Sequence, residues 1–222
     1  MLYLTNQLLQ KDLVDDLRLR LMIESSWQDG IVSTTQQIRT ENSIKKNIEI
    51  SPNNVHKKFS DEIINSLFNN DYIKLATYPA IIHNIIFSRT GPGMYYRPHV
   101  DVPFSKEGRR DLSFTIFLND PEEYKGGELI LYNSNDSKSI KLRAGDIVIY
   151  PTKYLHEVKA VTEGERIVCV GWIESQIAND DDRESLLLLK LGMTEISNEK
   201  NSEKAMQKLN LAYNRIYRRF LN

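Results

Sequence analysis

Hydrophobic residues recur at helical spacing near the start of the chain, at Leu9, Leu13, Leu17 and Leu21. This spacing predicts an amphipathic helix, and Asp29-Gly30 predicts the turn that ends it. The polar residues 33–58 predict a loop, with a lid and a plain surface loop both left open, and Ser60 is expected to cap a short second helix. Residues 1–77 are therefore expected to form a support region of helices and loops.

The hydrophobic pattern changes at about residue 80, where short runs of β-branched and aromatic residues alternate with turn signals such as Gly126-Gly127. The runs are Ile81–Phe87, Leu112–Leu118, Glu128–Tyr132, Asp146–Tyr150 and Arg166–Ile173. Short strands at this spacing are typical of a β-sandwich or barrel. A parallel βαβ sheet is disfavoured because no helix-sized segment separates the runs. Residues 78–177 are therefore predicted to be a β core.

Helical patterns return after Ser175. Acidic residues open the stretch Asp180–Leu191, and Gly192 is expected to stop this helix. A second amphipathic stretch covers residues 199–221, and its predicted apolar face comprises Leu209, Ala212, Ile216 and Phe220. Residues 178–222 are expected to form a C-terminal helical extension.

Composition narrows the range of possible partners and locations. The 222 residues include 29 Lys+Arg and 30 Asp+Glu, a net charge of −1, so no nucleic-acid or membrane partner is expected. There is no apolar run of transmembrane length and no signal-peptide pattern. The single cysteine, Cys169, excludes an internal disulfide and a cysteine-rich zinc site, and these features together predict a cytoplasmic protein.

The four histidines differ in their surroundings. His56, beside two lysines in a polar stretch, is interpreted as a solvated surface residue, and His83 as a core or edge-strand residue with one hydrogen bond. His99 and Asp101 are two residues apart, so in an extended chain they point to the same face. His156 comes 57 residues after His99, a distance over which a β-barrel chain can return beside it.

Two histidines and one aspartate on one face are the ligand set of non-haem Fe(II) oxygenases, which leaves three positions open. Arg166 begins the last predicted strand, and a guanidinium can hold both oxygens of a carboxylate. His99, Asp101, His156 and Arg166 together match the pattern for binding iron and 2-oxoglutarate. Ser113 or Thr115 is expected to add a hydroxyl contact to the 2-oxoglutarate. The alternative is a surface His-x-Asp with an arginine paired to a local acid.

The chain resembles the PKHD-type Fe(II)- and 2-oxoglutarate-dependent hydroxylases, relatives of the prolyl 4-hydroxylases. The resemblance runs through most of the chain and rests on long, ordered motifs. They are Trp27–Gly30, Arg110–Ser113, Tyr124–Leu129, Ala144–Asp146 with Tyr150-Pro151, Leu155-His156, and Trp172-Ile173 with Ser175. One departure is Phe87–Thr90, where the family usually has Phe-Asn-Arg-Tyr. Tyr95 or Tyr96 is expected to compensate for the tyrosine replaced by Thr90.

The resemblance implies a double-stranded β-helix, a cupin-like jelly roll, with N-terminal helices packed on it and a C-terminal helical segment. It implies His99, Asp101 and His156 as iron ligands, Arg166 as the 2-oxoglutarate anchor, O2 as co-substrate and ascorbate as reductant. Tyr96 is expected near the cofactors, and Trp172 and Tyr95 are candidates for the substrate entrance.

The predicted function is hydroxylation of a C–H bond, with a prolyl residue in a protein or peptide preferred and a free amino acid or other small metabolite left open. The reaction is coupled to decarboxylation of 2-oxoglutarate to succinate and CO2. Two alternatives from other classes are a catalytically silent β-barrel that binds peptides and a His2Asp zinc hydrolase. The sequence leaves the oligomeric state open between monomer and homodimer.

Overall fold

The computed structural model describes residues 3–33, 44–197 and 203–220. Its largest element is a seven-stranded sheet with the strand order β1-β13-β9-β16-β5-β4-β2, in which all neighbours are antiparallel. The strands are β1 (Leu4–Gln7), β2 (Trp27–Asp29), β4 (Ile48–Ile50), β5 (Pro79–Thr90), β9 (Leu112–Phe117), β13 (Asp146–Pro151) and β16 (Arg166–Ser175). Besides helices, the N-terminal region thus supplies strands β1, β2 and β4 to this sheet.

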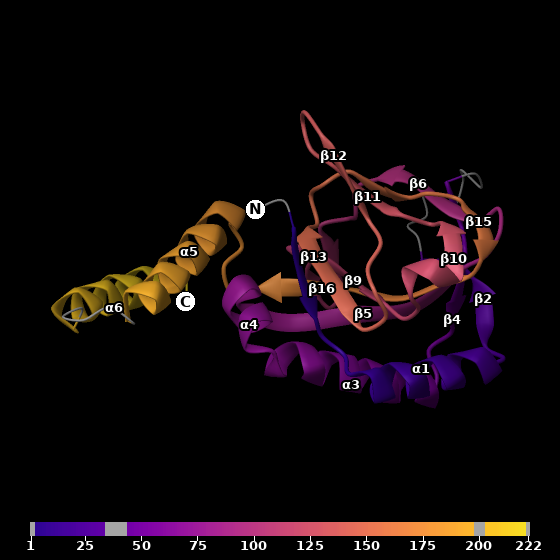
Figure 1. Ribbon diagram of the computed structural model, residues 1–222, viewed down its shortest axis with the longest axis horizontal. Helices are drawn as coiled ribbons and strands as arrows, with labels where there is room; N and C mark the ends of the chain where they lie inside the picture. Colours follow the sequence, from indigo (N-terminus) through magenta and orange to yellow (C-terminus); the bar gives the residue numbers. More distant parts are fainter. Residues whose placement is uncertain (1–2, 34–43, 198–202, 221–222) are drawn as a thin grey trace.

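A second, five-stranded antiparallel sheet has the order β12-β11-β14-β6-β3 and lies against the first (Figure 1). Its strands are β3 (Lys45–Lys46), β6 (Tyr95–His99), β11 (Leu129–Tyr132), β12 (Ser137–Ile140) and β14 (His156–Val158). Two hairpin-sized sheets pair β7 (Phe104–Ser105) with β8 (Gly108–Arg109) and β10 (Tyr124–Gly126) with β15 (Val161–Gly164). The mainly antiparallel jelly roll predicted from the sequence is confirmed.

Both faces of the seven-stranded sheet are buried, which explains the nearly continuous apolar runs of its central strands. On β9, Phe114 and Ile116 pack on the helical side, whereas Thr115 and Phe117 point between the two sheets. Strand β16 repeats this alternation, and its inward positions are Arg166, Val168, Val170 and Trp172. The inward row of each central strand therefore combines apolar residues with the polar residues expected at the site.

Helices α1 (Lys11–Ile23) and α3 (Asn54–Asn69) run along the outer face of the sheet (Figure 1), followed by the short α4 (Asp71–Thr77). Leu17, Leu21 and Ile63 are fully buried or nearly so in the cluster beneath them. The prediction of a loop over residues 33–58 is wrong for residues 44–58. Strands β3 and β4 lie in this part of the chain, and α3 begins at Asn54. Residues 34–43 lie outside the described residues.

The predicted cap of the second helix is also wrong. Asn53 caps α3 by accepting a hydrogen bond from the His56 backbone N–H at 2.7 Å, whereas Ser60 lies inside the helix. The Ser60 hydroxyl donates to the His56 carbonyl at 2.7 Å, a bond that serine can make within a helix. The helix begins earlier than predicted because the polar residues of its first turn carry no apolar periodicity.

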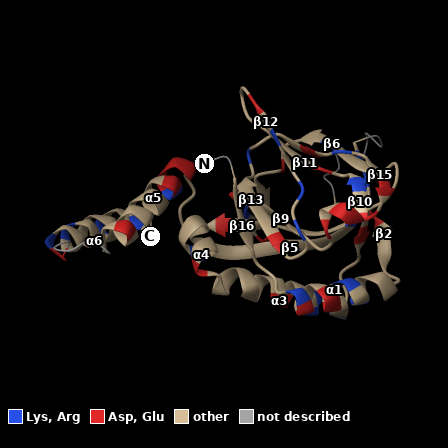
Figure 2. Cartoon of the chain, viewed as in Figure 1, with Lys and Arg blue, Asp and Glu red and all other residues tan. Residues whose placement is uncertain are grey.

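The C-terminal segment is a pair of helices, α5 (Asp180–Ser197) and α6 (Glu203–Tyr217), that projects from the sheets (Figure 1). Three acidic residues open α5, where they complement the helix dipole (Figure 2). Gly192 does not stop α5, which continues to Ser197. Tyr213, Tyr217 and Phe220 pack toward Tyr78. The inward face of α6 therefore differs from the predicted one, because Ala212 and Ile216, which were expected on that face, are exposed in the structure. None of the helices in the described residues is long and apolar enough to cross a membrane.

Candidate metal and co-substrate site

A cavity of about 1020 Å³ opens between the two sheets. Its walls include the inward residues of β5, β9, β13 and β16 and the facing residues of β6 and β14. All nine residues singled out from the sequence line it, namely Tyr95, Tyr96, His99, Asp101, Ser113, Thr115, His156, Arg166 and Trp172. The jelly roll thus gathers into one cavity side chains that are far apart in the sequence.

His99, Asp101 and His156 form a compact group whose candidate ligand atoms lie within 4.8 Å of one another. His99 ends β6 and His156 begins β14, and the two residues are direct register partners across these strands. Asp101 Oδ1 lies 3.5 Å from His99 Nε2 and 3.8 Å from His156 Nε2. Spacings of this size leave room for a metal ion between the three atoms.

The hydrogen bonds of the two imidazoles leave the nitrogens that face Asp101 free. Nδ1 of His99 donates to the Arg97 carbonyl at 2.8 Å, and Nδ1 of His156 donates to the Tyr154 carbonyl at 2.9 Å. In each neutral ring the proton is then on Nδ1 and the lone pair is on Nε2. Burial lowers the pKa of His156, which favours this neutral form.

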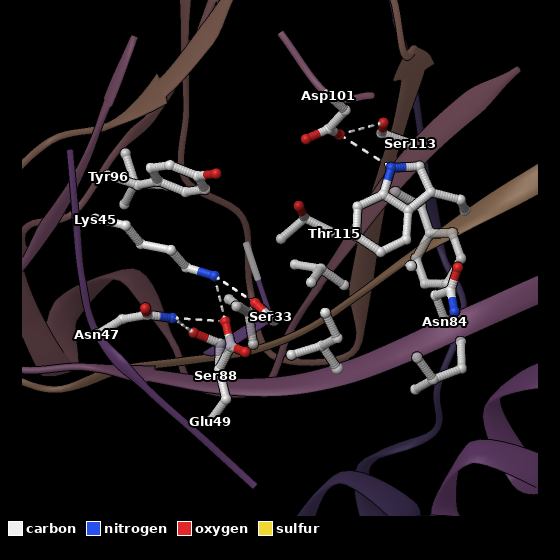
Figure 3. Close-up of a pocket in the computed structure, with 18 of the residues that line it drawn as sticks. Ser33, Lys45, Asn47, Glu49, Asn84, Ser88, Tyr96, Asp101, Ser113 and Thr115 are labelled. Carbon is white, nitrogen blue, oxygen red and sulfur yellow. Dashed lines mark hydrogen bonds and ion pairs between the residues drawn. The ribbon is translucent and has the colours of Figure 1, made fainter. Parts of the chain in front are cut away.

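Asp101 is held by its other oxygen. Asp101 Oδ2 accepts hydrogen bonds from the Ser113 hydroxyl at 2.9 Å and from the Trp172 indole N–H at 3.0 Å (Figure 3). Burial alone would raise the pKa of Asp101, but interactions with His99 and His156 in their protonated forms, together with the Trp172 indole N–H, outweigh it and lower the pKa. The carboxylate is therefore ionised, with Oδ1 directed at both histidines.

Arg166 is a buried cation at the start of β16, and only 3% of the residue is exposed. Its guanidinium lies 5.5 Å from the Phe117 ring centroid, and within the described part of the chain no carboxylate forms an ion pair with it. Burial lowers the pKa of Arg166, yet arginine keeps its charge in proteins. A buried charge without an ion-pair partner is costly, so this arginine favours binding of an anion in the cavity.

Two buried polar atoms beside this cation point to the same conclusion. Neither Arg166 Nε nor the Tyr124 hydroxyl has a hydrogen-bond partner of good geometry among the described residues. Gly127 permits the close approach, because it has a φ of +69° and a Cβ there would stand 3.1 Å from Arg166 Cδ. The donors around Arg166 therefore fit a carboxylate, and the His–Asp–His group on the same cavity fits a divalent metal.

The remaining predicted residues have different surroundings. The Ser113 hydroxyl is engaged with Asp101 and with Thr152 Oγ1 at 3.0 Å, whereas Thr115 lies near the centre of the cavity (Figure 3). Tyr96 stacks on the His99 ring with 3.6 Å between centroids and 17° between planes. Thr90 is buried as the Cα partner of Arg166 on β5, so the departure from the family pattern falls directly beside this cation.

Two residues near the site carried no clear signal in the sequence. Tyr150 is buried on β13, and burial raises its pKa well above the ordinary value. The Tyr150 ring packs edge-on to His156 at 5.3 Å, so it separates the metal group from the apolar core. Tyr124 lies beside Arg166. Both residues belong to motifs that the chain shares with the PKHD-type hydroxylases, and this resemblance is the sequence signal that could have identified them.

The interpretation of His56 as a solvated surface residue is wrong. His56 is part-buried on α3, its Nε2 lies 2.9 Å from the Ile85 carbonyl, and its ring packs edge-on to Phe87. The polar neighbours misled the prediction because helix periodicity turns His56 toward the sheet and the lysines toward solvent. His83 is buried, as predicted, but it contacts Asn84, Ser105 and the Arg109 carbonyl rather than one partner.

The comparisons with known proteins agree with this geometry. The model of the 2OG-Fe(II) oxygenase superfamily matches residues 85–174, the stretch that holds the His–Asp–His group and Arg166. Fold and site together define an oxidoreductase of the 2-oxoglutarate-dependent dioxygenase class, which uses Fe(II), 2-oxoglutarate and O2.

Relatives along the full length of the chain narrow this class. A PKHD-type hydroxylase of Prochlorococcus marinus (strain MIT 9313) is 40% identical over 218 residues, which is 97% of each chain. Another, from strain AS9601, is 42% identical over 192 residues, 86% of each chain. The chain belongs to the PKHD-type hydroxylases.

Solved structures show the same fold at lower identity. A prolyl hydroxylase from Trichoplax adhaerens, in complex with a hypoxia inducible factor peptide fragment, has a TM-score of 0.56 and 16% identity, covering 83% of this chain and 86% of that chain. A Pseudomonas putida prolyl-4-hydroxylase has a TM-score of 0.52 and 20% identity, covering 78% of this chain and 92% of that chain. These similarities support the assignment of the fold as a jelly roll with helices packed on it.

Proposed function

We propose that this hydroxylase acts on a prolyl residue in a protein or peptide, with Fe(II) held by His99, Asp101 and His156 and 2-oxoglutarate anchored by Arg166. The observation that carries the proposal is the pairing of a His–Asp–His group with a buried arginine that forms no ion pair among the described residues, on one cavity. A His2Asp zinc hydrolase would leave that arginine without a function.

The reaction is R–H + O2 + 2-oxoglutarate → R–OH + succinate + CO2, and the bound iron supplies the redox chemistry that activates O2. The protein supplies geometry. Three ligand side chains on one face leave the other metal positions for 2-oxoglutarate and O2. Ser113 and Trp172 fix Asp101 Oδ2, so that Oδ1 alone is presented to the metal.

The co-substrate would lie at the part of the cavity that Arg166 lines. Arg166 would take the far carboxylate of 2-oxoglutarate bidentately, and the Tyr124 hydroxyl would donate to the same group. Thr115 is the remaining hydroxyl from the predicted pair, because Ser113 is engaged with Asp101. Tyr96 covers the face of His99 and would help to exclude water from the metal.

The prolyl substrate is favoured by the names of the two structural relatives described above, both of which are prolyl hydroxylases. Trp172 and Tyr95 line the cavity and remain the proposed substrate contacts. Ascorbate as reductant and a cytoplasmic location stay predictions. The same holds for the oligomeric state and for the division at residues 77 and 177.

The iron and 2-oxoglutarate roles are tested together by spectroscopy. Anaerobic addition of Fe(II) and 2-oxoglutarate should produce a weak visible metal-to-ligand charge-transfer band. Asp101→Ala should abolish both this band and the release of succinate while the far-UV circular dichroism is unchanged. A folded, metal-loaded protein without the band would refute 2-oxoglutarate binding, and succinate release by Asp101→Ala would refute the ligand assignment.

The substrate is tested by mass spectrometry. Candidate proteins incubated with the enzyme, Fe(II), 2-oxoglutarate and O2 should gain 16 Da on a prolyl residue. The Asp101→Ala variant is the matched control. A gain of 16 Da only on free amino acids or on other residue types would contradict the prolyl assignment.

A further inference from the structure

A second polar group faces the same cavity from the N-terminal region and from β5. We call it the inner polar cluster, and it comprises Ser33, Lys45, Asn47, Glu49 and Ser88. Lys45 Nζ donates to Glu49 Oε1 at 2.5 Å and to Ser33 Oγ at 2.9 Å. Asn47 Nδ2 donates to Glu49 Oε1 at 3.1 Å and to Ser88 Oγ at 2.6 Å. The ion pair is therefore held in one arrangement by neighbours on both sides.

The inner polar cluster is one aromatic ring away from the metal group. Lys45 is the register partner of Tyr96 across β3 and β6, and its Nζ lies 5.1 Å from the Tyr96 ring centroid. Tyr96 in turn stacks on His99. In Figure 3 Lys45 and Glu49 point toward one another below Tyr96, across the cavity from Asp101 and Ser113. A molecule that reaches the metal through this cavity would pass beside the pair.

Burial makes this ion pair a poor stabilising device. The side chains of Lys45 and Glu49 are only 7% and 6% exposed. Removing two charges from water costs about as much as, or more than, their attraction returns, so apolar residues at such positions often give equal or greater stability. A buried pair that also lines a reaction cavity is better explained by what it binds.

Among the described residues, the pair retains unused hydrogen-bonding capacity. An ammonium has three N–H groups, and within that part of the chain Lys45 uses two of them, on Ser33 and Glu49. Glu49 Oε2 accepts no hydrogen bond from the described residues, and it does not belong to the fully buried, unpartnered oxygens. The cavity wall thus offers one donor and one acceptor side by side, with no net charge.

We propose that the Lys45–Glu49 pair is a substrate subsite that binds a neutral amide of the peptide chain next to the hydroxylated residue. This inference rests on the proposed function and selects among its substrates. An amide carries one carbonyl acceptor and one N–H donor, which match Lys45 Nζ and Glu49 Oε2. A carboxylate at the same place would face Glu49, and an ammonium would face Lys45.

A free amino acid fits the pair less well than a peptide. It would bring two full charges out of water into the cavity, and it would have to compete with an ion pair already made at 2.5 Å. The neutral amide loses less hydration on entry and leaves the pair intact. The subsite therefore favours a residue inside a chain over a free amino acid.

The test uses three small probes on the full chain loaded anaerobically with Fe(II) and 2-oxoglutarate. They are N-acetyl-L-prolinamide, which has neutral amides at both ends, N-acetyl-L-proline, which ends in a carboxylate, and L-proline, a zwitterion. Dissociation constants come from ligand-observed NMR titrations. N-acetyl-L-prolinamide should bind about tenfold more tightly than either of the others. Equal binding of the three, a preference for L-proline, or no binding of the amide would overturn the proposal.

Variants identify the residues responsible. Lys45→Met and the isosteric Glu49→Gln should each weaken amide binding about tenfold, since each removes a charge-assisted hydrogen bond. The exposed pair Lys11 and Asp15 has the same spacing, so Lys11→Met and Asp15→Asn are matched controls and should leave binding unchanged. Amide binding that survives in folded Lys45→Met and Glu49→Gln would refute the assignment. If these variants do not fold, the wild-type preference alone decides.

The same samples separate this inference from the proposed function. The charge-transfer band of the wild-type protein reports the iron and 2-oxoglutarate roles and is recorded without any of the three probes. Loss of the band in the wild-type protein would sink the proposed function. A normal band without amide preference would sink only the subsite.

Discussion

Replacing Ser113 with alanine tests whether hydrogen bonds to Asp101 control metal affinity. Asp101 Oδ2 accepts two hydrogen bonds, from Ser113 at 2.9 Å and from Trp172 at 3.0 Å. A hydrogen bond to a charged group contributes about 1.5–3 kcal/mol. Loss of one outer partner typically lowers metal affinity about 10–100-fold, or about 1.4–2.7 kcal/mol, and the two ranges agree. Ser113→Ala should therefore weaken Fe(II) binding by this factor.

The assay is an anaerobic Fe(II) titration of the metal-free protein, read by the charge-transfer band in excess 2-oxoglutarate. Ser66→Ala is the matched control, because the Ser66 hydroxyl donates only to the Glu62 carbonyl of its own helix at 2.8 Å. Thermal unfolding of the metal-free variants shows whether the fold is intact. Unchanged metal affinity in Ser113→Ala would refute the reasoning, as would an equal loss of affinity in Ser66→Ala.

Three further predictions concern the co-substrate, the metal and the core. Arg166→Gln should raise the KM for 2-oxoglutarate at least about thirtyfold, since losing one partner of a buried charged contact costs about 2–5 kcal/mol. The control is Arg89→Gln, which alters an arginine outside the cavity and should leave this KM unchanged. A divalent metal with 2-oxoglutarate at 100 times its dissociation constant should stabilise the fold by about 2.7 kcal/mol, so an unchanged Tm would contradict specific binding to the folded state. Ile63→Ala should lower the free energy of unfolding in urea by about 2–5 kcal/mol because Ile63 is fully buried, whereas the exposed Leu19→Ala should have little effect.

The central strands and the metal group were predictable because their signals are local. His99 and Asp101 stand two residues apart in the sequence, His156 opens β14, which pairs with the strand that ends at His99, and Arg166 opens β16 of the larger sheet. Buried strands can also be recognised in the sequence as short apolar runs between turn residues. These features need no knowledge of long-range packing.

Other features depend on contacts between distant segments. The role of Ser113 is set by Asp101 and Thr152, and the inner polar cluster joins β3, β4 and β5 across polar sequence that predicts only a loop. His56 was misjudged because its neighbours in sequence are polar although its neighbours in space are not. Sequence periodicity does not report which partner a polar side chain finds.

The cross-strand position of the two histidines has a consequence for the stability of the smaller sheet. His99 and His156 are register partners on β6 and β14, so a metal held by both would tie two strands that are far apart in the sequence. Because the ligands meet only in the folded chain, binding of the ion would stabilise the folded state. Local opening of β6 from β14 would break ligand bonds as well as backbone hydrogen bonds. The amide protons of these strands should therefore exchange more slowly in the loaded enzyme, which makes the ion a structural clamp as well as a reaction centre.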